Sequence, residues 1–343
     1  MKRLLCLGSA LVFILIPFSG RLSAQERPWM KHIAPSAYFQ SGFTTDNSLD
    51  NSFYIRRVRV SLGGTLCENA DSGKLEYKLQ AELAGSPKIV DCFFKYTICD
   101  EFGIQLGQYK TPLSIENSEV TPLKLEMIDY SLLVQRFCRM SATDLSGISS
   151  AGREIGLQFF GKALKMPDGH HLLQYNAAIF NGNGINKMDD DCRKDLSLRL
   201  IVCPVRGLGI AAYYLRTIGP HPDTVPVGGY DWHVYDRYGG GIAYDSDFAW
   251  FRAEYMTGHT FGSRGEGAYG TIGYKFNKAF SAGFRYDYFN SDSREAGHVQ
   301  QHYTAAANWY PFSGLRLQIN YTYRQEPGAG PLHAVSLLTS IIL

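Results

Sequence analysis

Residues 74–83 read Lys-Leu-Glu-Tyr-Lys-Leu-Gln-Ala-Glu-Leu, a strict alternation of polar and apolar side chains. Successive side chains of a strand point to opposite sides, so a strand here would have Leu, Tyr, Leu, Ala and Leu on one face. The other face would carry only Lys, Glu and Gln. The stretch therefore predicts a β-strand with one apolar and one charged face. The same alternation recurs in residues 90–98, 195–202, 279–288 and 315–324.

Alternating segments of this kind recur along the chain at a steady spacing, separated by turn residues, whereas helical periodicity is rare. We expect about sixteen strands of roughly ten residues or slightly more. That length is what a tilted membrane-spanning strand requires, and it exceeds the usual strand of a soluble protein. The predicted strands cover residues 33–43, 53–66, 74–84, 88–98, 103–112, 153–163, 171–181, 193–203, 207–217, 235–245, 248–258, 266–276, 279–290, 299–310, 314–325 and 332–343.

The links between these segments alternate in length. Several are tight and polar or marked by Gly or Pro, as at 99–102 and 311–313, whereas links 182–192 and 218–234 are longer. Short turns on one rim and longer loops on the other are typical of outer-membrane barrels. The fold class we predict is an all-β, transmembrane antiparallel β-barrel with both termini on the short-turn side. A soluble exported β protein is the alternative, because its sheets show the same alternation.

The amino terminus has the pattern of an export signal. Met1-Lys2-Arg3 precedes an apolar run over residues 4–18, and a small residue, Ala24, marks the predicted cleavage point. An anchoring helix is the alternative, but the run is shorter than the roughly 20 residues that a span needs. We therefore expect a signal peptide over residues 1–24 and a barrel over 25–343, without a domain boundary.

The charges of the chain nearly cancel, with 34 Lys and Arg against 32 Asp and Glu. Removing residues 1–24 leaves 31 basic and 32 acidic side chains. This balance gives no support to nucleic-acid binding, which needs a basic stripe or a strongly basic domain. No G-x-S-x-G elbow or isolated acidic cluster indicates an enzyme. No Cys or His spacing suits a metal such as zinc, no cofactor is predicted, and the pairing of the six remaining cysteines stays open.

If the apolar faces meet lipid, the charged faces line the lumen, and about sixteen strands leave room for a water-filled channel. Lys and Arg in a narrow pore favour anions, because low-dielectric walls focus their field on the permeating ion. Acids on the same faces, such as Glu76, Asp91 and Asp287, act against this preference. For any single charged residue, the alternative role is to pair with a residue on a neighbouring strand or to occupy a solvated position on the wall. The strand residues that we expect to line the channel are Arg57, Arg59, Lys78, Lys95, Arg199, Arg252, Arg285 and Arg316.

One link is much longer than the others. Residues 113–152 form a connection of about forty residues, and a loop of that length in a compact domain is usually functional. Folded into the lumen, it would narrow the pore and set its selectivity, with Lys124 and Arg136 as candidate channel-lining cations. The alternative is an extracellular loop with its own short helix around residues 125–134.

Four motifs resemble a known family. They are Phe-Tyr-Ile-Arg-Arg-Val-Arg at 53–59 followed by Gly-Gly-Thr-Leu at 63–66, Leu-Gly-Gln-Tyr-Lys-Thr-Pro-Leu-Ser-Ile-Glu at 106–116, Arg-Glu-Ile-Gly-Leu-Gln at 153–158, and Phe-Asn-Gly-Asn-Gly-Ile-Asn at 180–186. In this order they resemble the phosphate-selective porin O and P family. The resemblance implies a sixteen-stranded outer-membrane barrel, often trimeric, whose third extracellular loop folds inward as a constriction.

Lys110 lies within the second motif and is a further channel-lining candidate. Strict alternation places it on the same face as Ile104 and Leu106, which points it toward lipid. A bulge at Gly107, or a position at the rim from which the side chain reaches water, would reconcile the two readings.

Together these patterns predict an outer-membrane porin of a Gram-negative bacterium, forming a channel for passive diffusion of small solutes or inorganic anions. Its expected partners are outer-membrane lipid, these solutes and two further copies in a homotrimer, but not nucleic acid. Phosphate is among the candidate solutes. A closed or plugged barrel with an adhesive or assembly role is the alternative, because the mixed charges of the lumen are also compatible with it.

Overall fold

The computed structural model describes residues 33–69, 73–190, 192–220 and 232–343. The predicted signal peptide, residues 1–24, lies outside these residues. Among the described residues, no helix has the length and apolar character needed to cross a bilayer.

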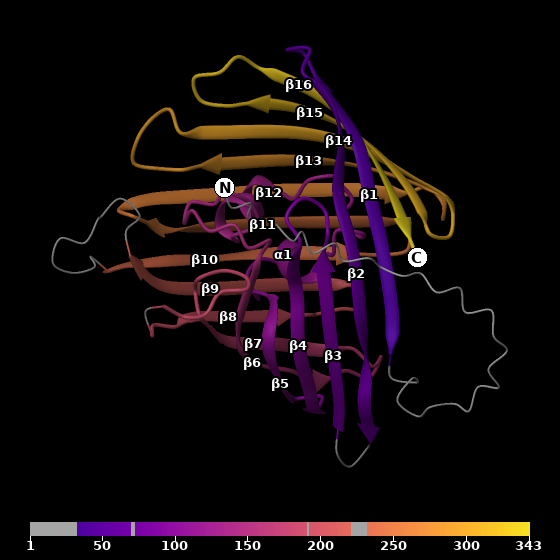
Figure 1. Cartoon of the computed structure of the whole chain (residues 1–343), viewed down its shortest axis with the longest axis vertical. Coiled ribbons are helices and arrows are strands. Elements are labelled where there is room, and N and C mark those ends of the chain that lie inside the picture. Colours follow the sequence, from indigo (N-terminus) through magenta and orange to yellow (C-terminus); the bar gives the residue numbers. More distant parts are fainter. Residues whose placement is uncertain (1–32, 70–72, 191, 221–231) are drawn as a thin grey trace, which may run out of the picture.

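Sixteen antiparallel strands follow one another in chain order, and β1 pairs with β16, so that the sheet closes into a barrel. Figure 1 shows the indigo β1 beside the yellow β16. The predicted fold class is thereby confirmed. The strands are β1 Ala34–Asp46, β2 Asn51–Asn69, β3 Gly73–Glu82, β4 Lys88–Cys99, β5 Phe102–Lys110, β6 Arg153–Lys165, β7 His171–Phe180, β8 Asp195–Val202, β9 Leu208–Pro220, β10 Trp232–Asp245, β11 Ala249–Thr260, β12 Ser263–Lys275, β13 Phe280–Asn290, β14 Val299–Phe312, β15 Leu315–Gln325 and β16 Leu332–Ile342.

The strand register sorts side chains between two faces of the wall. In the pairing of β2 with β3, Leu62 lies opposite Leu79, and their exposed fractions are 44% and 41%. The neighbouring pair has the opposite character, since Gln80 is buried and donates from Nε2 to Ser61 Oγ at 2.7 Å. Because the two faces alternate along every strand, the apolar residues form the outer surface and the polar residues form the inner one.

The ends of the barrel differ, as the link lengths predict. Links 100–101, 203–207 and 313–314 lie at one end, and the longer links 111–152 and 181–194 lie at the other. One link at the long end is short, because Phe261 and Gly262 alone join β11 to β12. Their φ angles of 49° and 85° fit a two-residue hairpin turn of type I′.

Residues 111–152, here called the β5–β6 segment, contain two short helices, α1 Ile115–Glu119 and α2 Leu132–Phe137. The predicted helix around 125–134 begins later than expected, because Ser131 caps α2 by accepting from the Val134 N–H. Apolar residues of the segment, including Leu133 and Phe137, pack against Tyr213, Met256 and Phe289 of the wall. The apolar core of the molecule therefore joins the segment to one side of the barrel.

Candidate functional site

The β5–β6 segment contacts the wall on several sides at once. Because β2, β8, β11, β13 and β15 lie around the closed ring, we infer that the segment lies inside the barrel. Its contacts with these strands are Arg56 to Asp129 at 2.6 Å, Arg199 to Glu119 at 2.5 Å, Arg252 to Glu126 at 2.6 Å, Arg285 to the Asp129 carbonyl at 2.7 Å and Arg316 to the Leu125 carbonyl at 2.6 Å.

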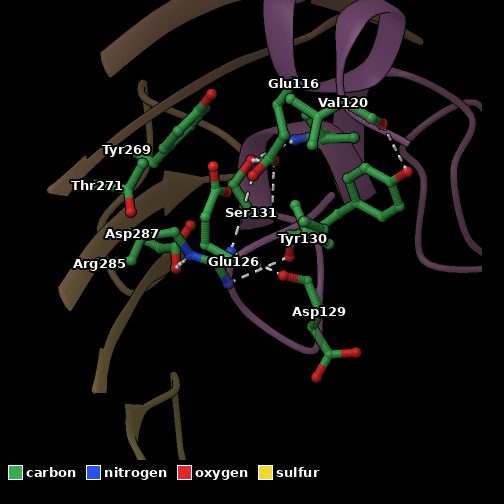
Figure 2. A network of polar contacts seen from close by, with 12 residues as sticks. Glu116, Val120, Glu126, Asp129, Tyr130, Ser131, Tyr269, Thr271, Arg285 and Asp287 are labelled. Atoms are coloured by element: carbon green, nitrogen blue, oxygen red, sulfur yellow. Dashed lines mark hydrogen bonds and ion pairs between the residues drawn. The ribbon is translucent and has the colours of Figure 1, made fainter. Parts of the chain in front are cut away.

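A polar network holds the middle of the segment against β13 (Figure 2). The Glu116 carboxylate accepts from the Ser131 N–H at 2.9 Å and from its hydroxyl at 2.6 Å. Asp287 accepts from the Leu132 N–H at 3.0 Å and also pairs with Arg285 at 2.7 Å. Because all five residues are buried or nearly so, these bonds hold the α2 end of the segment in one position.

Glu254 of β11 holds the other helix. Its carboxylate accepts from the Ser114 hydroxyl and from the N–H groups of Ile115 and Glu116, at 2.7 to 3.0 Å. The hydroxyls of Tyr213 and Tyr269 donate to the same carboxylate at 2.6 and 2.5 Å. A carboxylate at a helix N-terminus satisfies N–H groups that have no partner within the helix, so Glu254 fixes the start of α1.

Arg139 anchors the segment to a third part of the wall. Its guanidinium lies 2.7 Å from Glu154 and 2.9 Å from Asp195, and it donates to the Thr217 hydroxyl at 3.1 Å. Burial alone would lower the pKa of Arg139, but Asp195 and Glu154 raise the pKa above its usual value. The side chain is therefore a permanent buried cation, shared between two acids.

The segment leaves space on the side of β1 to β8. A cavity of about 520 Å³ there, which we call the basic chamber, has six cations and two acids in its lining. The cations are Arg59, Lys78, Lys95, Lys110, Arg153 and Arg199, and the acids are Asp91 and Glu119. A smaller cavity of about 200 Å³ shares Arg59, Pro122 and Arg153 with it. The two cavities therefore adjoin at these residues.

The small cavity is surrounded by guanidinium groups. Arg56, Arg57, Arg59 and Arg153 line it together with one acid, Asp129. We call these four arginines the arginine cluster. Arg59 pairs with Glu82 at 2.8 Å and Arg153 with Asp91 at 2.6 Å. Arg57 donates to the Gln40 amide oxygen at 2.9 Å and forms no ion pair with a described acid.

A bulge in β2 brings two consecutive arginines to the cluster. Gln40 of β1 lies opposite Arg57, but the next residue, Ser41, lies opposite Ile55, so Arg56 is an extra residue in β2. An extra residue interrupts the alternation of faces. Arg56 and Arg57 consequently both line the cavity, while Ile55 stays on the outer surface.

The other side of the interior is electrically balanced. A cavity of about 1130 Å³ between the segment and β7 to β14, which we call the neutral chamber, has four cations and four acids in its lining. The cations are Lys124, Arg252, Lys275 and Lys278, and the acids are Glu119, Glu126, Asp245 and Asp247. Glu119 and Leu123 line both chambers, so the segment separates the two.

The predicted channel-lining residues fall into three groups. Arg57, Arg59, Lys78, Lys95, Lys110 and Arg199 gather around the basic chamber and the small cavity. Lys124 and Arg252 line the neutral chamber. Arg136, Arg285 and Arg316 line none of these three cavities and bind other groups. Arg136 donates to Gln300, whereas Arg285 and Arg316 donate to carbonyls of the segment.

Lys110 lies on the inner side at the end of β5, and of the two explanations offered by the sequence the bulge at Gly107 fails. The register of β5 with β4 and β6 runs through Gly107 without a bulge there, so that prediction was wrong. Gly107 instead has a φ of 127°, where a Cβ would lie 2.2 Å from the Cys92 carbonyl oxygen. The Lys110 ammonium, at the end of β5, donates to the carbonyls of Asn117 and Val120 at 2.5 and 2.8 Å.

Sequence reasoning missed Arg56 and Arg153 as cavity-lining cations. Strict alternation excludes Arg56, because it places consecutive residues on opposite faces. Arg153 is the first residue of β6, directly after the long segment, and alternation says little about a strand end. The run of three arginines at positions 56, 57 and 59 was the available signal.

Three solved porins share this fold over 91% of the chain. They are OmpF of Salmonella typhi in complex with daunomycin (TM-score 0.69, 11% identity, 98% of that chain), the anion-selective porin of Comamonas acidovorans (0.66, 11%, 99%) and OmpT of Vibrio cholerae in its trimer form (0.64, 12%, 99%). At this identity, the likeness shows the architecture alone.

No curated protein matches the chain by sequence. The profile of the family described as phosphate-selective porin O and P matches residues 36–226 and 265–334, which is most of the chain. The four sequence motifs lie within the first of these ranges. The chain therefore belongs to the phosphate-selective porin O and P family, and it is an outer-membrane porin that forms a channel for passive diffusion.

Proposed function

We propose that the β5–β6 segment is the constriction of this channel and that solutes pass along the side of β1 to β8. The basic chamber and the small cavity form the proposed route. The neutral chamber is larger, but the apolar core of the segment packs against β8, β9 and β11 to β13 on that side and its charges balance, so it is less suited to selective passage. The arginine cluster lines the smaller of the two cavities on this route.

We further propose that the channel favours small anions. The observation that carries this proposal is the lining of the small cavity, in which four guanidinium groups face one carboxylate. Fixed cations in a narrow, water-filled passage raise the local concentration of anions, and low-dielectric walls strengthen the effect. Guanidinium groups also match the geometry of oxyanions, which they bind through paired N–H donors.

Phosphate is a proposed member of this anion class rather than the sole solute. Membership of the family supports phosphate, and so does the arginine cluster. Asp91, however, neutralises part of the charge, because its two oxygens pair with Arg153 at 2.6 Å and with Lys78 at 2.8 Å. We therefore expect phosphate to share the route with other small anions.

Planar-bilayer recording of the refolded, full-length mature protein tests this function. Under a potassium chloride gradient, we expect discrete conductance steps and a reversal potential that indicates anion preference. Added phosphate should reduce the chloride current as it competes for the route. A reversal potential on the cation side would overturn the selectivity, whereas a silent barrel would favour the plugged alternative.

We also propose a homotrimer surrounded by outer-membrane lipid. OmpT of Vibrio cholerae is described in a trimer form, and the exposed apolar side chains of the outer surface suit lipid or neighbouring subunits. Cross-linking in native membranes would give a ladder ending at three subunits. The family and fold indicate a channel rather than an enzyme, and the lack of catalytic activity remains a prediction.

A further inference from the structure

Among the residues that the structure describes, Asp129 is the one acid in the lining of the small cavity. Its Oδ1 lies 2.6 Å from Nη2 of Arg56, and Arg57, Arg59 and Arg153 line the same space. The side chain of Asp129 is 48% exposed, so it projects into the cavity rather than into packed protein. A carboxylate thus already occupies the place where the arginine cluster would meet a passing anion.

The backbone of Asp129 is fixed while its side chain is not buried. Arg285 donates to the Asp129 carbonyl at 2.7 Å and to the Tyr130 carbonyl at 3.4 Å. Figure 2 shows this carbonyl turned toward Arg285 and the carboxylate pointing away from the network. The hydrogen bonds from Arg285 of β13 therefore hold the Asp129 backbone so that its carboxylate points toward the opposite side of the interior.

The pair of Arg56 with Asp129 spans the proposed route. Among the ion pairs of the described residues, it is the one that joins the β5–β6 segment to β1–β4. The segment's other pairs lie on β6 to β13, and one of them, Arg199 with Glu119, lines the basic chamber. The small cavity, which holds the arginine cluster, is therefore crossed by one ion pair of the described residues, and the acid of that pair is half exposed.

We propose that the Asp129 carboxylate is a tethered competitor, which a permeating anion must displace from Arg56 before it can pass the arginine cluster. This inference rests on the proposed function and names a residue that limits the passage of anions. An ion pair with an exposed member is weak, so a solute anion can exchange with it. A tight pair would close the route. Without the pair, the arginine cluster would be free to hold anions longer.

The competitor is charged under ordinary conditions. Partial loss of solvent around Asp129 opposes its ionisation, but the charge of Arg56 and its hydrogen bond outweigh this and lower the pKa of Asp129 to about 2. A group with a lowered pKa stays ionised above that value. Mild acid therefore leaves the pair with Arg56 intact, and a substitution is needed to remove it.

Replacing Asp129 by Asn (D129N) tests the inference, with E126Q as the matched control. Glu126 belongs to the same segment and pairs with Arg252 at 2.6 Å, but it lines the neutral chamber. Single-channel conductance would be recorded in planar bilayers over a range of potassium chloride concentrations. For D129N we expect the half-saturating concentration to fall about two- to fivefold, as the loss of a weak competing ion pair implies, and for E126Q to stay near that of the wild type.

The R56Q background separates competition from a general effect of charge. If Asp129 competes through Arg56, D129N should change the half-saturating concentration much less when Arg56 is already Gln. An equal change in both backgrounds would contradict the inference, because long-range electrostatics alone would then explain it. If the wild type prefers anions but D129N and E126Q have the same half-saturating concentration, the inference is wrong and the proposed function stands. A cation-preferring wild type overturns both.

Discussion

The two sides of the interior differ in the number of their cations and in how these cations are neutralised. On the side of the neutral chamber, Arg252 pairs with Glu126, and the segment covers the wall with an apolar core. On the side of the basic chamber, cations outnumber acids by six to two in the lining. The difference teaches that net charge is a poor guide to selectivity in this porin, because the folded segment decides which charges are neutralised.

The segment itself produces this asymmetry. Its acids Glu116, Glu119 and Glu126 pair with arginines of β13, β8 and β11, and among the described residues only Asp129 pairs with an arginine of β2. The walls of β2 to β6 therefore keep cations such as Arg57 that face the cavity without an acidic partner among the described residues. Three predictions address this comparison.

The largest effect is expected from releasing the segment with Glu254→Ala. The substitution leaves five donors without their acceptor, among them the hydroxyls of Tyr213 and Tyr269. Buried groups left unsatisfied cost about 1–3 kcal/mol each, so both stability and the separation of the chambers should be lost. Heat-denaturation midpoints should fall, and single-channel traces should become larger and noisier.

Glu266→Ala is the matched control for this change. Glu266 also accepts from two tyrosine hydroxyls, of Tyr255 and Tyr288, at 3.2 and 3.1 Å, but these contacts do not involve the segment. Traces of this variant should resemble those of the wild type. If both variants gave the same conductance, Glu254 would have no special part in holding the segment.

An intermediate effect is expected from reversing one cation of the arginine cluster. Arg57→Glu should move the reversal potential toward cations, because Arg57 faces the small cavity and no described acid neutralises it. Arg252→Glu in the neutral chamber provides the comparison and should move it less. A reversal potential unchanged by Arg57→Glu would place this residue outside the ion path.

The smallest effect is expected from Lys275→Gln. Lys275 lines the neutral chamber and pairs with Asp245 at 2.5 Å, so the chamber keeps a near balance of charge without it. The reversal potential should stay within the scatter of repeated wild-type recordings. A shift as large as that of Arg57→Glu would show that ions also use the neutral side, and the comparison of the two chambers would fail.

Alternation predicted the wall well because lipid and water impose it on every strand. The stretch at 74–83 became β3 Gly73–Glu82, and Lys78 and Lys95 line the basic chamber. The functions of Arg285 and Arg316 could not be foreseen in the same way. They depend on contacts with the segment, about 150 to 190 positions away in sequence.

The contacts of the segment were beyond sequence reasoning for a physical reason. Its path is set by individual hydrogen bonds, such as those of Glu254 and Arg139, and not by a repeating period. Arg56 was missed for a related reason, because one extra residue in a strand leaves no trace in composition. Long-range pairing and local irregularity therefore mark the limit of what alternation could predict.

The extra residue in β2 reverses which positions of the strand face the pore and which face outward. Before the bulge in chain order, the odd-numbered residues Phe53 and Ile55 lie on the outer surface. After it, the odd-numbered residues Arg57 and Arg59 line the cavities. A one-residue insertion or deletion can thus bring a guanidinium to the pore or remove it without altering the residues on either side. Changes in strand length, and not only substitutions, are therefore a route by which porins of this family can diverge in selectivity.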